Sequence, residues 1–419
     1  MKKVLVVTYF WPPSGKATLH WPLNIIKYLP EFGCEPFVLT VNEESFTQKD
    51  ESMLLEINPS LKVYKSRSFE PFGIYKKFTG RGKKEHIIES ETISKTNKSL
   101  PHLISIWIRM NLFIPDARVG WYFGAVRMGK KIIKENKIEA VTSIGPPHSS
   151  HLIAYRLSKL FSIPHYPVFI DPWVDIVYYK NFKRSQATLA LDNFFERKVL
   201  KHSMASIFVT QTMKNNYLMK YNFLKEKSFV LYWGYDEESF DNNEYKKTSD
   251  YDKIIHAGNI FDYQNPVKFW KLVKQKIVSG QKLRIKFIGS VSPAIKKEII
   301  SAGLEEYTEY ADFLSYKELI TELINAKYLL VCASEPRHVP GKLFEYLRTG
   351  RPIIAFGDDN EEVSEILKTS NAGMIFNYHE NGSSFFDLSD KFKTNLDVVK
   401  HFDRKLITKK FSEIIKGKI

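Results

Sequence analysis

The segment HVPGKLFEYLRTGRP combines a helix start with groups that can bind an anion. Pro340 is expected near the first helical position, which leaves the N–H groups of Gly341 and Lys342 available to a phosphate. Glu345 follows one turn later, where its carboxylate can accept hydrogen bonds from the two hydroxyls of a ribose. The ordinary alternative for Glu345 is a surface ion pair with Arg348. The segment therefore predicts a phosphate site beside a hydroxyl-binding carboxylate.

A second candidate is the turn PPSGK, between an apolar strand near the N-terminus and a helical pattern. Gly15 and Lys16 in this turn can present N–H groups and positive charge to a phosphate. A P-loop would need Gly in place of Phe10 and Ser or Thr in place of Ala17, and the glycine spacing of a dinucleotide fingerprint is missing. The turn is either another kind of phosphate loop or an ordinary strand-to-helix turn.

His148 is the third candidate, in SIGPPHSSHLIAYRLSKL. The pattern predicts that a strand ends at Gly145 and that a helix begins near Ser149, which places His148 at the mouth of a cleft. An imidazole there can donate a hydrogen bond to a sugar hydroxyl or stabilise charge at a reacting carbon. The alternatives are that His148 caps the helix, or that His151, one turn away, is the polar partner.

These candidates depend on strands that place them at one edge of a sheet. Apolar runs alternate with helical patterns in two series, which is typical of buried parallel sheets covered by helices. Ligands of such sheets bind beyond the carboxyl ends of the strands, a rule that also selects Asp171 and Trp173 in DPWVD. The runs are VLVVTYF, EPFVLTV, EAVTSIG, HYPVFID and SIFVTQ, then KIIHAG, LRIKFIG, YLLVCAS and RPIIAFG.

The two series predict two α/β domains with a cleft between them. The first domain is expected over 1–235, and the polar stretch 236–252 is expected to be a linker. The second domain is expected over 253–399. An amphipathic helix over 400–419 is expected to pack back on the first domain.

Composition favours a globular protein with anionic partners. Of the 419 residues, 43% are hydrophobic and 26% charged, and the formal net charge is +15. Such a charge favours nucleic acid, sugar nucleotides or acidic lipid headgroups. Cys34 and Cys332 lie far apart in apolar surroundings, which predicts neither a disulfide nor a zinc site and fits the cytoplasm.

Basic and aromatic residues gather in two stretches, 72–84 and 103–121. Neither is an uninterrupted apolar segment long enough to span a bilayer. They are suited to peripheral contact with an anionic membrane, on the inner face of the cell membrane. The alternative is a solvated loop with a lysine-rich face.

The sequence predicts no metal site and no hydrolytic nucleophile. Asp250-Tyr251-Asp252 has the Asp-x-Asp pattern that holds a metal and a sugar nucleotide in one class of transferase, but it precedes a strand instead of following one. No other spacing of His, Asp or Glu suggests metal ligands, and no Gly-x-Ser-x-Gly elbow is present.

Taken together, five segments resemble the motifs of GT-B glycosyltransferases of the retaining family 4 type, in order and in spacing. The resemblance runs over about residues 1–376, and the segments are YFWPPSGKATLHW, SIGPPHSSHLIAYRL, FIDPW, HAGNI and GKLFEYLRTGRPIIAF. It implies two Rossmann-like α/β domains whose parallel sheets face a central cleft. It also implies transfer of a sugar from a nucleotide donor with retained anomeric configuration and without an obligatory metal or cofactor.

The resemblance also implies residue roles. His148 would lie near the donor hexose, Gly341 and Lys342 would face the diphosphate, and Glu345 would be the second glutamate of Glu-x7-Glu, which binds ribose. The residues expected in catalysis are His148, Lys342 and Glu345, and the acceptor side is expected at Trp11, Asp171 and Trp173. Donor-binding residues are expected at Gly15, Lys16, Gly258, Asn259, Lys268, Arg337, Gly341, Lys342 and Glu345.

Three positions depart from the family pattern. Lys16 replaces a second glycine, Arg337 stands where the first glutamate is expected, and Glu335 lies two residues too early to replace it. The loop after HAGNI has Gln264 where an arginine for the phosphates is common. Arg337, Lys342 or Lys268 could supply the missing positive charge.

The sequence therefore predicts a glycosyltransferase that moves a hexose-type sugar, most plausibly from a UDP-sugar, to a lipid-linked or polysaccharide acceptor. A GT-B sugar-nucleotide epimerase is the alternative enzyme. A catalytically silent GT-B protein that binds phosphate or nucleic acid is the non-enzymatic alternative, although no nucleic-acid partner is expected for the glycosyltransferase.

Overall fold

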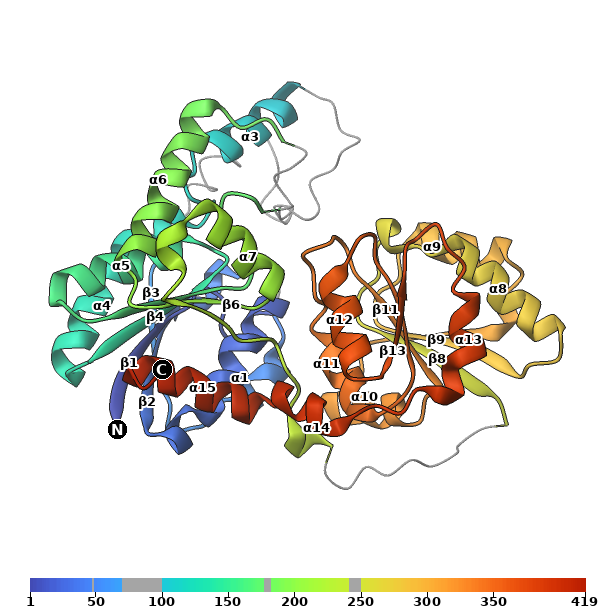
Figure 1. The fold of residues 1–419 in the computed structure, drawn as a ribbon. Coiled ribbons are helices and arrows are strands. Elements are labelled where there is room, and N and C mark those ends of the chain that lie inside the picture. The colour runs from blue at the N-terminus through green and yellow to red at the C-terminus, as the bar shows by residue number, and fades with distance from the viewer. Residues whose placement is uncertain (47–48, 70–99, 177–181, 241–249) are drawn as a thin grey trace. The chain divides into compact units, whose positions relative to one another are not determined.

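The computed structural model describes residues 1–46, 49–69, 100–176, 182–240 and 250–419. The chain forms two compact units (Figure 1). The first unit contains Met1–Leu231 together with Thr408–Ile419, and the second contains Tyr232–Ile407. Tyr235 and Phe240 pack in the core of the second unit. Residues 241–249 of the expected linker lie outside the described residues.

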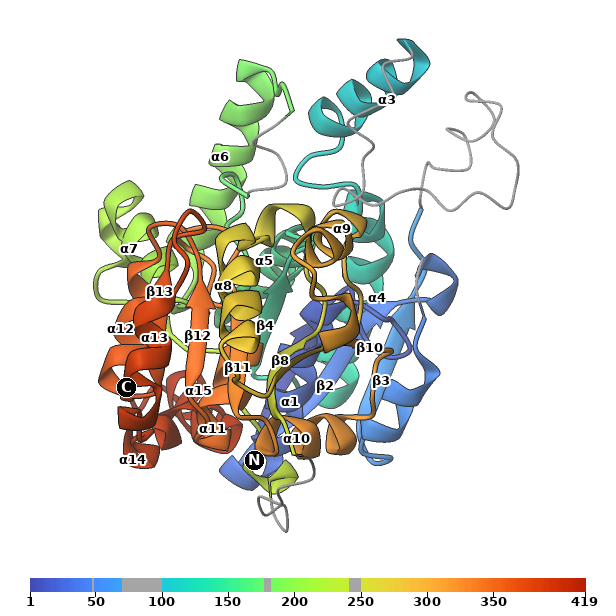
Figure 2. The ribbon, with the colours of Figure 1, turned by 90° about the vertical axis from the view of Figure 1, so that its right-hand side faces the viewer.

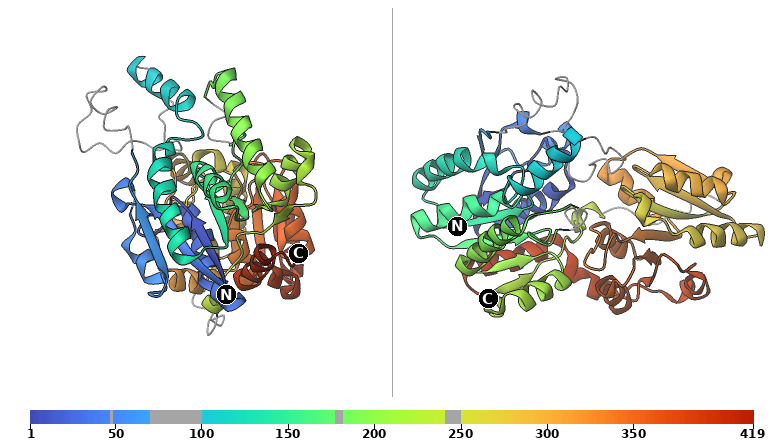
Figure 3. Two further views of the ribbon diagram at one scale, coloured as in Figure 1. Left: turned by 90° about the vertical axis from the view of Figure 1, so that its left-hand side faces the viewer. Right: turned by 90° about the horizontal axis from the view of Figure 1, so that it is seen from above.

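A seven-stranded parallel sheet forms the centre of the first unit, in the order β3-β2-β1-β4-β5-β6-β7. Along β1, Val4, Leu5, Val6 and Val7 are all buried. Successive side chains of a strand point to opposite faces, so helices must cover both faces of this sheet, as Figure 3 shows. The strands are β1 Lys2–Val7, β2 Cys34–Val41, β3 Lys62–Ser66, β4 Ala140–Gly145, β5 His165–Phe169, β6 Ser206–Phe208 and β7 Ser228–Val230.

The helices of the first unit lie in the connections between successive strands. Ser185 caps the longest, α6, by accepting a hydrogen bond from the backbone N–H of Thr188. Helix α3 and the N-terminal part of α6 project from the same end of this unit (Figures 1 and 2). The helices are α1 His20–Tyr28, α3 Leu100–Asn111, α4 Tyr122–Asn136, α5 Ser149–Phe161, α6 Gln186–His202 and α7 Gln211–Lys220.

The second unit repeats this architecture with a six-stranded parallel sheet, in the order β10-β9-β8-β11-β12-β13. Its strands are β8 Asp252–Ala257, β9 Leu283–Ile288, β10 Thr308–Ala311, β11 Tyr328–Cys332, β12 Ile353–Phe356 and β13 Gly373–Phe376. Its helices are α8 Val267–Val278, α9 Pro293–Ser301, α10 Tyr316–Ile324, α11 Lys342–Thr349, α12 Glu361–Thr369, α13 Ser383–Leu388 and α14 Leu396–Val399.

The last helix, α15 (Arg404–Lys416), begins in the second unit and ends in the first. Phe411 is buried with its ring centroid 5.9 Å from that of Trp21 in α1. The backbone carbonyl of Ile415 accepts a hydrogen bond from the Tyr166 hydroxyl at 3.1 Å. The end of the chain is therefore part of the core of the first unit.

All nine predicted strands are present, and the predicted end of a strand at Gly145 is confirmed. Helix α11 also ends as predicted, because Gly350 adopts the left-handed conformation with a φ of 71°. Four strands were not predicted, namely β3, β7, β10 and β13. Each of them lies at an edge of its sheet.

Candidate functional site

Strand order places the strongest candidate site in the second unit. The chain moves outward from β8 to β9 and β10 on one side, and from β11 to β12 and β13 on the other. Ligands of doubly wound sheets bind at such a switch point, outside the carboxyl ends of the two central strands. The turn that follows β8 contains Gly258 and Asn259, and the loop that follows β11 leads to Lys342, the first residue of α11.

The Lys342 ammonium lies beneath that turn. Its Nζ is 3.2 Å from Nε2 of His256, near the end of β8. Burial lowers the pKa of Lys342 to about 8. Gly258 has a φ of 88°, and a Cβ atom there would lie 3.1 Å from the Lys342 Nζ. The turn leaves the ammonium uncovered because Gly258 has no side chain and tolerates positive φ.

Gly341 and Lys342 lie together as predicted at the start of α11, with Gly341 as its N-terminal cap. An ideal Cβ at Gly341 would be 3.6 Å from the Trp233 ring, an ordinary contact distance. Asn259 is exposed beside Gly258. A cation, a helix N-terminus and a side-chain-free turn therefore meet at the switch point, which suits a phosphate.

Glu345 does not pair with Arg348, which was the alternative considered from the sequence. Arg348 instead forms a two-pronged ion pair with Glu237. Oε1 of Glu345 accepts hydrogen bonds from Arg404 at 2.8 Å and from the Tyr316 hydroxyl at 3.3 Å. Burial raises the pKa of Glu345, and the Arg404 guanidinium opposes this shift.

Gln264 has a structural role in this structure. Its Oε1 accepts a hydrogen bond from the Phe261 N–H, and its Nε2 donates to the carbonyl of Cys332 at 2.8 Å. Arg337 forms an ion pair with Glu335 at 3.2 Å, and Lys268 is exposed on α8. Of the three possible sources of the missing charge, Lys342 is the one whose side chain contacts His256 beneath the Gly258 turn.

In the first unit, His148 and Trp173 are in direct contact. Their rings stack with centroids 5.1 Å apart and planes 4° apart, and both residues are buried. Desolvation lowers the pKa of His148 to about 3, so the imidazole is neutral near pH 7. Its Nε2 lies 3.2 Å from the carbonyl of Pro172, which can only accept, so Nε2 carries the proton. Nδ1, buried without a hydrogen-bond partner, is then an acceptor.

Asp116 occupies the N-terminus of α5, for which the sequence suggested a cap by His148. Its carboxylate accepts a hydrogen bond from the Ser149 N–H at 2.8 Å and another from the Ser149 hydroxyl at 2.7 Å. Burial raises the pKa of Asp116. His148 makes no side-chain cap. Asp116 is 33 residues away in the chain, and no local pattern points to this contact.

The remaining predicted residues of the first unit differ in exposure. Trp11 is buried, and its Nε1 has no hydrogen-bond partner. Trp173 is also buried, and its Nε1 donates to Oδ1 of Asp192 at 2.6 Å. Gly15 is exposed, whereas Lys16 and Asp171 are partly buried. The polar groups of the two predicted acceptor-side tryptophans thus lie inside the unit.

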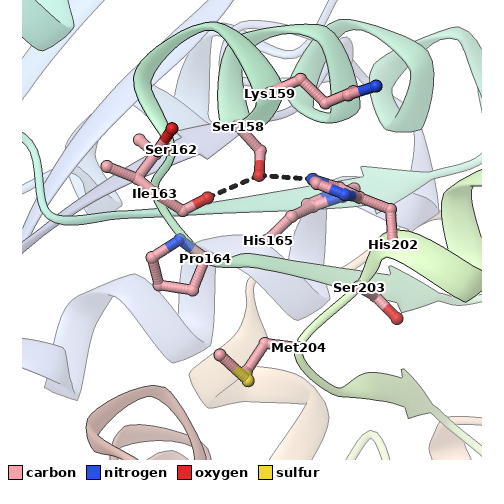
Figure 4. Close-up of a pocket in the computed structure, with 9 residues that line it drawn as sticks. All are labelled: Ser158, Lys159, Ser162, Ile163, Pro164, His165, His202, Ser203 and Met204. Atoms are coloured by element: carbon pink, nitrogen blue, oxygen red, sulfur yellow. Dashed lines mark hydrogen bonds between the residues drawn. The ribbon is translucent and has the colours of Figure 1, made fainter.

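A pocket of about 490 Å³ lies in the first unit and is shown in Figure 4. Ser158 in this pocket is 2.9 Å from Nε2 of His202. Pro164 and His165, which line it, lie where β5 begins. The pocket is therefore at the amino end of β5, and none of the predicted site residues lines it.

Within the described residues, no group of three or more His, Cys, Asp and Glu side chains is placed to hold a metal ion. Asp250 lies just before β8, and Asp252 is the first residue of that strand.

Among the residues that the structure describes, no helix has the length and apolar character needed to cross a bilayer. Residues 72–84 lie outside the described residues.

No protein-family model matches the chain, and no curated protein matches its sequence. Solved structures do match, over nearly the whole length of both chains. Sucrose-phosphate synthase from Thermosynechococcus elongatus is 11% identical with a TM-score of 0.65, covering 100% of this chain and 99% of that one. The lipopolysaccharide outer core galactosyltransferase WaaB is 14% identical with a TM-score of 0.60, and coverage is 100% for both chains.

HepE from Anabaena, in complex with UDP and glucose, is 13% identical with a TM-score of 0.61 and 100% coverage of both chains. A structure described as a UDP-N-acetylglucosamine 2-epimerase from Listeria monocytogenes is 12% identical with a TM-score of 0.56, covering 100% of this chain and 97% of that one. At these identities the matches establish the fold.

The fold is of the GT-B class, with two parallel-sheet α/β units, as the sequence predicted. The structures that share it over full length include glycosyltransferases, and HepE was solved with UDP and glucose, with UDP, and with UDP-glucose.

Proposed function

We propose that the protein is a glycosyltransferase that moves a hexose-type sugar from a UDP-sugar to a glycan or lipid-linked acceptor, with retention and without a metal. The observation that carries this proposal is the partly buried Lys342 ammonium beneath the Gly258 turn, at the switch point of the second unit. The UDP and glucose bound to HepE support the donor class. The lipopolysaccharide substrate class of WaaB supports a glycan acceptor.

The proposed chemistry rests on charge that develops on the leaving diphosphate as the sugar departs. Lys342 and the N–H groups at the start of α11 stabilise that charge, and a buried cation is more effective in this role than an exposed one. Glu345 accepts hydrogen bonds from the ribose, while Arg404 keeps its carboxylate in place. Gly15, Lys16, Asn259, Lys268 and Arg337 are proposed as further donor contacts.

His148 is proposed to contact the hexose as a neutral acceptor. The sequence suggested a hydrogen-bond donor or a charge stabiliser, but Nε2 already donates its hydrogen bond to the Pro172 carbonyl. A sugar hydroxyl would therefore donate to Nδ1. Asp171 and Trp173 are proposed to border the acceptor, with Trp173 fixing the imidazole plane by stacking.

A membrane surface is the proposed location of the acceptor, at the cytoplasmic face. We define the α3–α6 surface by its exposed apolar side chains, Ile104, Trp107, Leu112, Leu191 and Phe194. In residues 100–118 and 182–202 the carboxylates are Asp116, Asp192 and Glu196, and all three are buried. Lys183, Arg197 and Lys198 are exposed there, so the surface combines apolar side chains with positive charge, which suits anionic lipid.

Thermal unfolding with UDP-, GDP-, ADP- and dTDP-sugars tests the donor assignment. A ligand at about a hundred times its dissociation constant stabilises a protein by about 2.7 kcal/mol. We expect UDP-sugars to raise the melting temperature of the wild type and to have little effect on Lys342→Met. Stabilisation by none of the four nucleotide classes, or equal stabilisation of the variant, would contradict the assignment.

The epimerase-like neighbour makes a sugar-nucleotide epimerase the second candidate. The two activities differ in whether UDP is released. A change in the sugar of the donor, with no UDP released and no acceptor needed, would favour the epimerase.

A further inference from the structure

The contact between His256 and Lys342 fixes the protonation of both groups. Nδ1 of His256 lies 3.0 Å from the carbonyl oxygen of Leu330, which can only accept a hydrogen bond. The Asn259 backbone also interacts with the ring. The 3.0 Å contact to Leu330 assigns the proton to Nδ1, and Nε2 of the neutral ring then has a lone pair. That lone pair points at the Lys342 Nζ, 3.2 Å away, so the ammonium is the donor.

Desolvation acts on the protonation of both His256 and Lys342. His256 is 1% exposed, and desolvation lowers its pKa well below the ordinary value, so it stays neutral. A buried ammonium without a hydrogen-bond acceptor would lose its proton or turn away. The other titratable groups that interact with Lys342 are Cys332 at the end of β11, His338 in the loop before α11, and Glu345 one turn into α11.

We propose that His256 is a positioning residue that accepts a hydrogen bond from Lys342 and so holds the ammonium charged and aimed at the diphosphate beneath Gly258. This inference deepens the proposed function and rests on it. In the sequence, His256 is part of the HAGNI motif, and no local pattern gives it a role.

The proposal predicts a particular pH dependence. The Lys342 pKa is about 8, so the ammonium is charged below that pH and loses its proton as the pH rises through it. UDP affinity should therefore fall as the pH rises past about 8. Uridine, which has no phosphate, should bind equally well just below and just above that pH. Loss of the acceptor at position 256 would destabilise the charged form and move this fall to lower pH.

The test compares His256→Gln with His256→Met, which have similar size but differ in having a side-chain acceptor. Titration calorimetry between about pH 6.5 and 8.5, below the pH at which uracil N3 ionises, would measure UDP and uridine binding to both variants, the wild type and Lys342→Met. We expect His256→Met to bind UDP about tenfold more weakly at pH 8, as the loss of a hydrogen bond to a charged group implies. His256→Gln should recover most of this affinity, and uridine binding should not change.

A second measurement needs no ligand. With 13Cε-labelled lysine, NMR titration of the Lys342 signal, assigned through Lys342→Met, should give a lower pKa in His256→Met than in the wild type or His256→Gln. Equal pKa values and equal UDP affinities in the two His256 variants would overturn the inference. A shifted pKa in a protein that binds no nucleotide would support the pair and contradict the donor site.

Discussion

At the residue scale, the sequence located the candidate groups but not their partners. Lys342 and Glu345 follow from the helix start that Pro340 predicts, because capping is a local property, although α11 begins at Lys342 with Gly341 as its cap. Their partners are distant in the chain, since His256 is 86 residues from Lys342 and Arg404 is 59 residues from Glu345. Such contacts depend on which strands and helices become neighbours, and no local pattern encodes them.

Glu345 allows a prediction at this scale. If its carboxylate accepts from the ribose, Glu345→Ala should weaken UDP binding more than tenfold and weaken binding of 2′,3′-dideoxy-UDP far less. Glu345→Gln keeps an acceptor for Arg404 and for the hydroxyls, so its loss should be smaller. Titration calorimetry with both nucleotides checks this. Equal losses with the two ligands would show that Glu345 supports the site through Arg404 without touching the ribose.

At the scale of elements, the sequence predicted the inner strands and missed the outer ones. Strands with two neighbours are covered on both faces and appear as apolar runs, such as YLLVC of β11. Edge strands have a single neighbour and carry more polar residues, as in KVYKS of β3 and TEYA of β10. The switch points lie between inner strands, so the loops at their carboxyl ends could be located from the sequence, whereas the sheet edges could not.

The α3–α6 surface carries the prediction for this scale. The double variant Trp107→Ser, Phe194→Ser should bind phosphatidylglycerol-containing vesicles at least about tenfold more weakly than the wild type, since each side chain would bury apolar area in the bilayer. Vesicle sedimentation measures this, with Val278→Ser, an exposed residue of α8, as the matched control. Equal binding to neutral phosphatidylcholine vesicles, or no effect of the double variant, would contradict an anionic membrane as partner.

At the scale of the whole molecule, the chain enters the second unit after Leu231 and returns to the first at Thr408. The sequence predicted the amphipathic C-terminal helix from its apolar periodicity. The residues at which the chain leaves one unit and joins the other depend on packing. Phe240 lies in the polar stretch 236–252 and Tyr235 just before it, and yet both are buried in the second core. A polar segment is thus a weaker sign of a boundary than the hydrophobic contacts made within it.

This return of the chain makes the stability of the first unit depend on its last residues. Phe411 is 1% exposed and packs against Trp21, so Phe411→Ala should destabilise the first unit by about 3 kcal/mol, the usual cost of removing a buried aromatic ring. Lys409→Ala, at an exposed position of the same helix, is the control. In a denaturant titration followed by tryptophan fluorescence, Phe411→Ala should lower the transition of the first unit. Without denaturant, UDP affinity should stay within about twofold of the wild type, because neither Phe411 nor Trp21 is a proposed donor contact. If Phe411→Ala lowered UDP affinity as strongly as it lowered stability, the two units would unfold as one cooperative body, and the separation of donor binding from the C-terminal helix would be wrong.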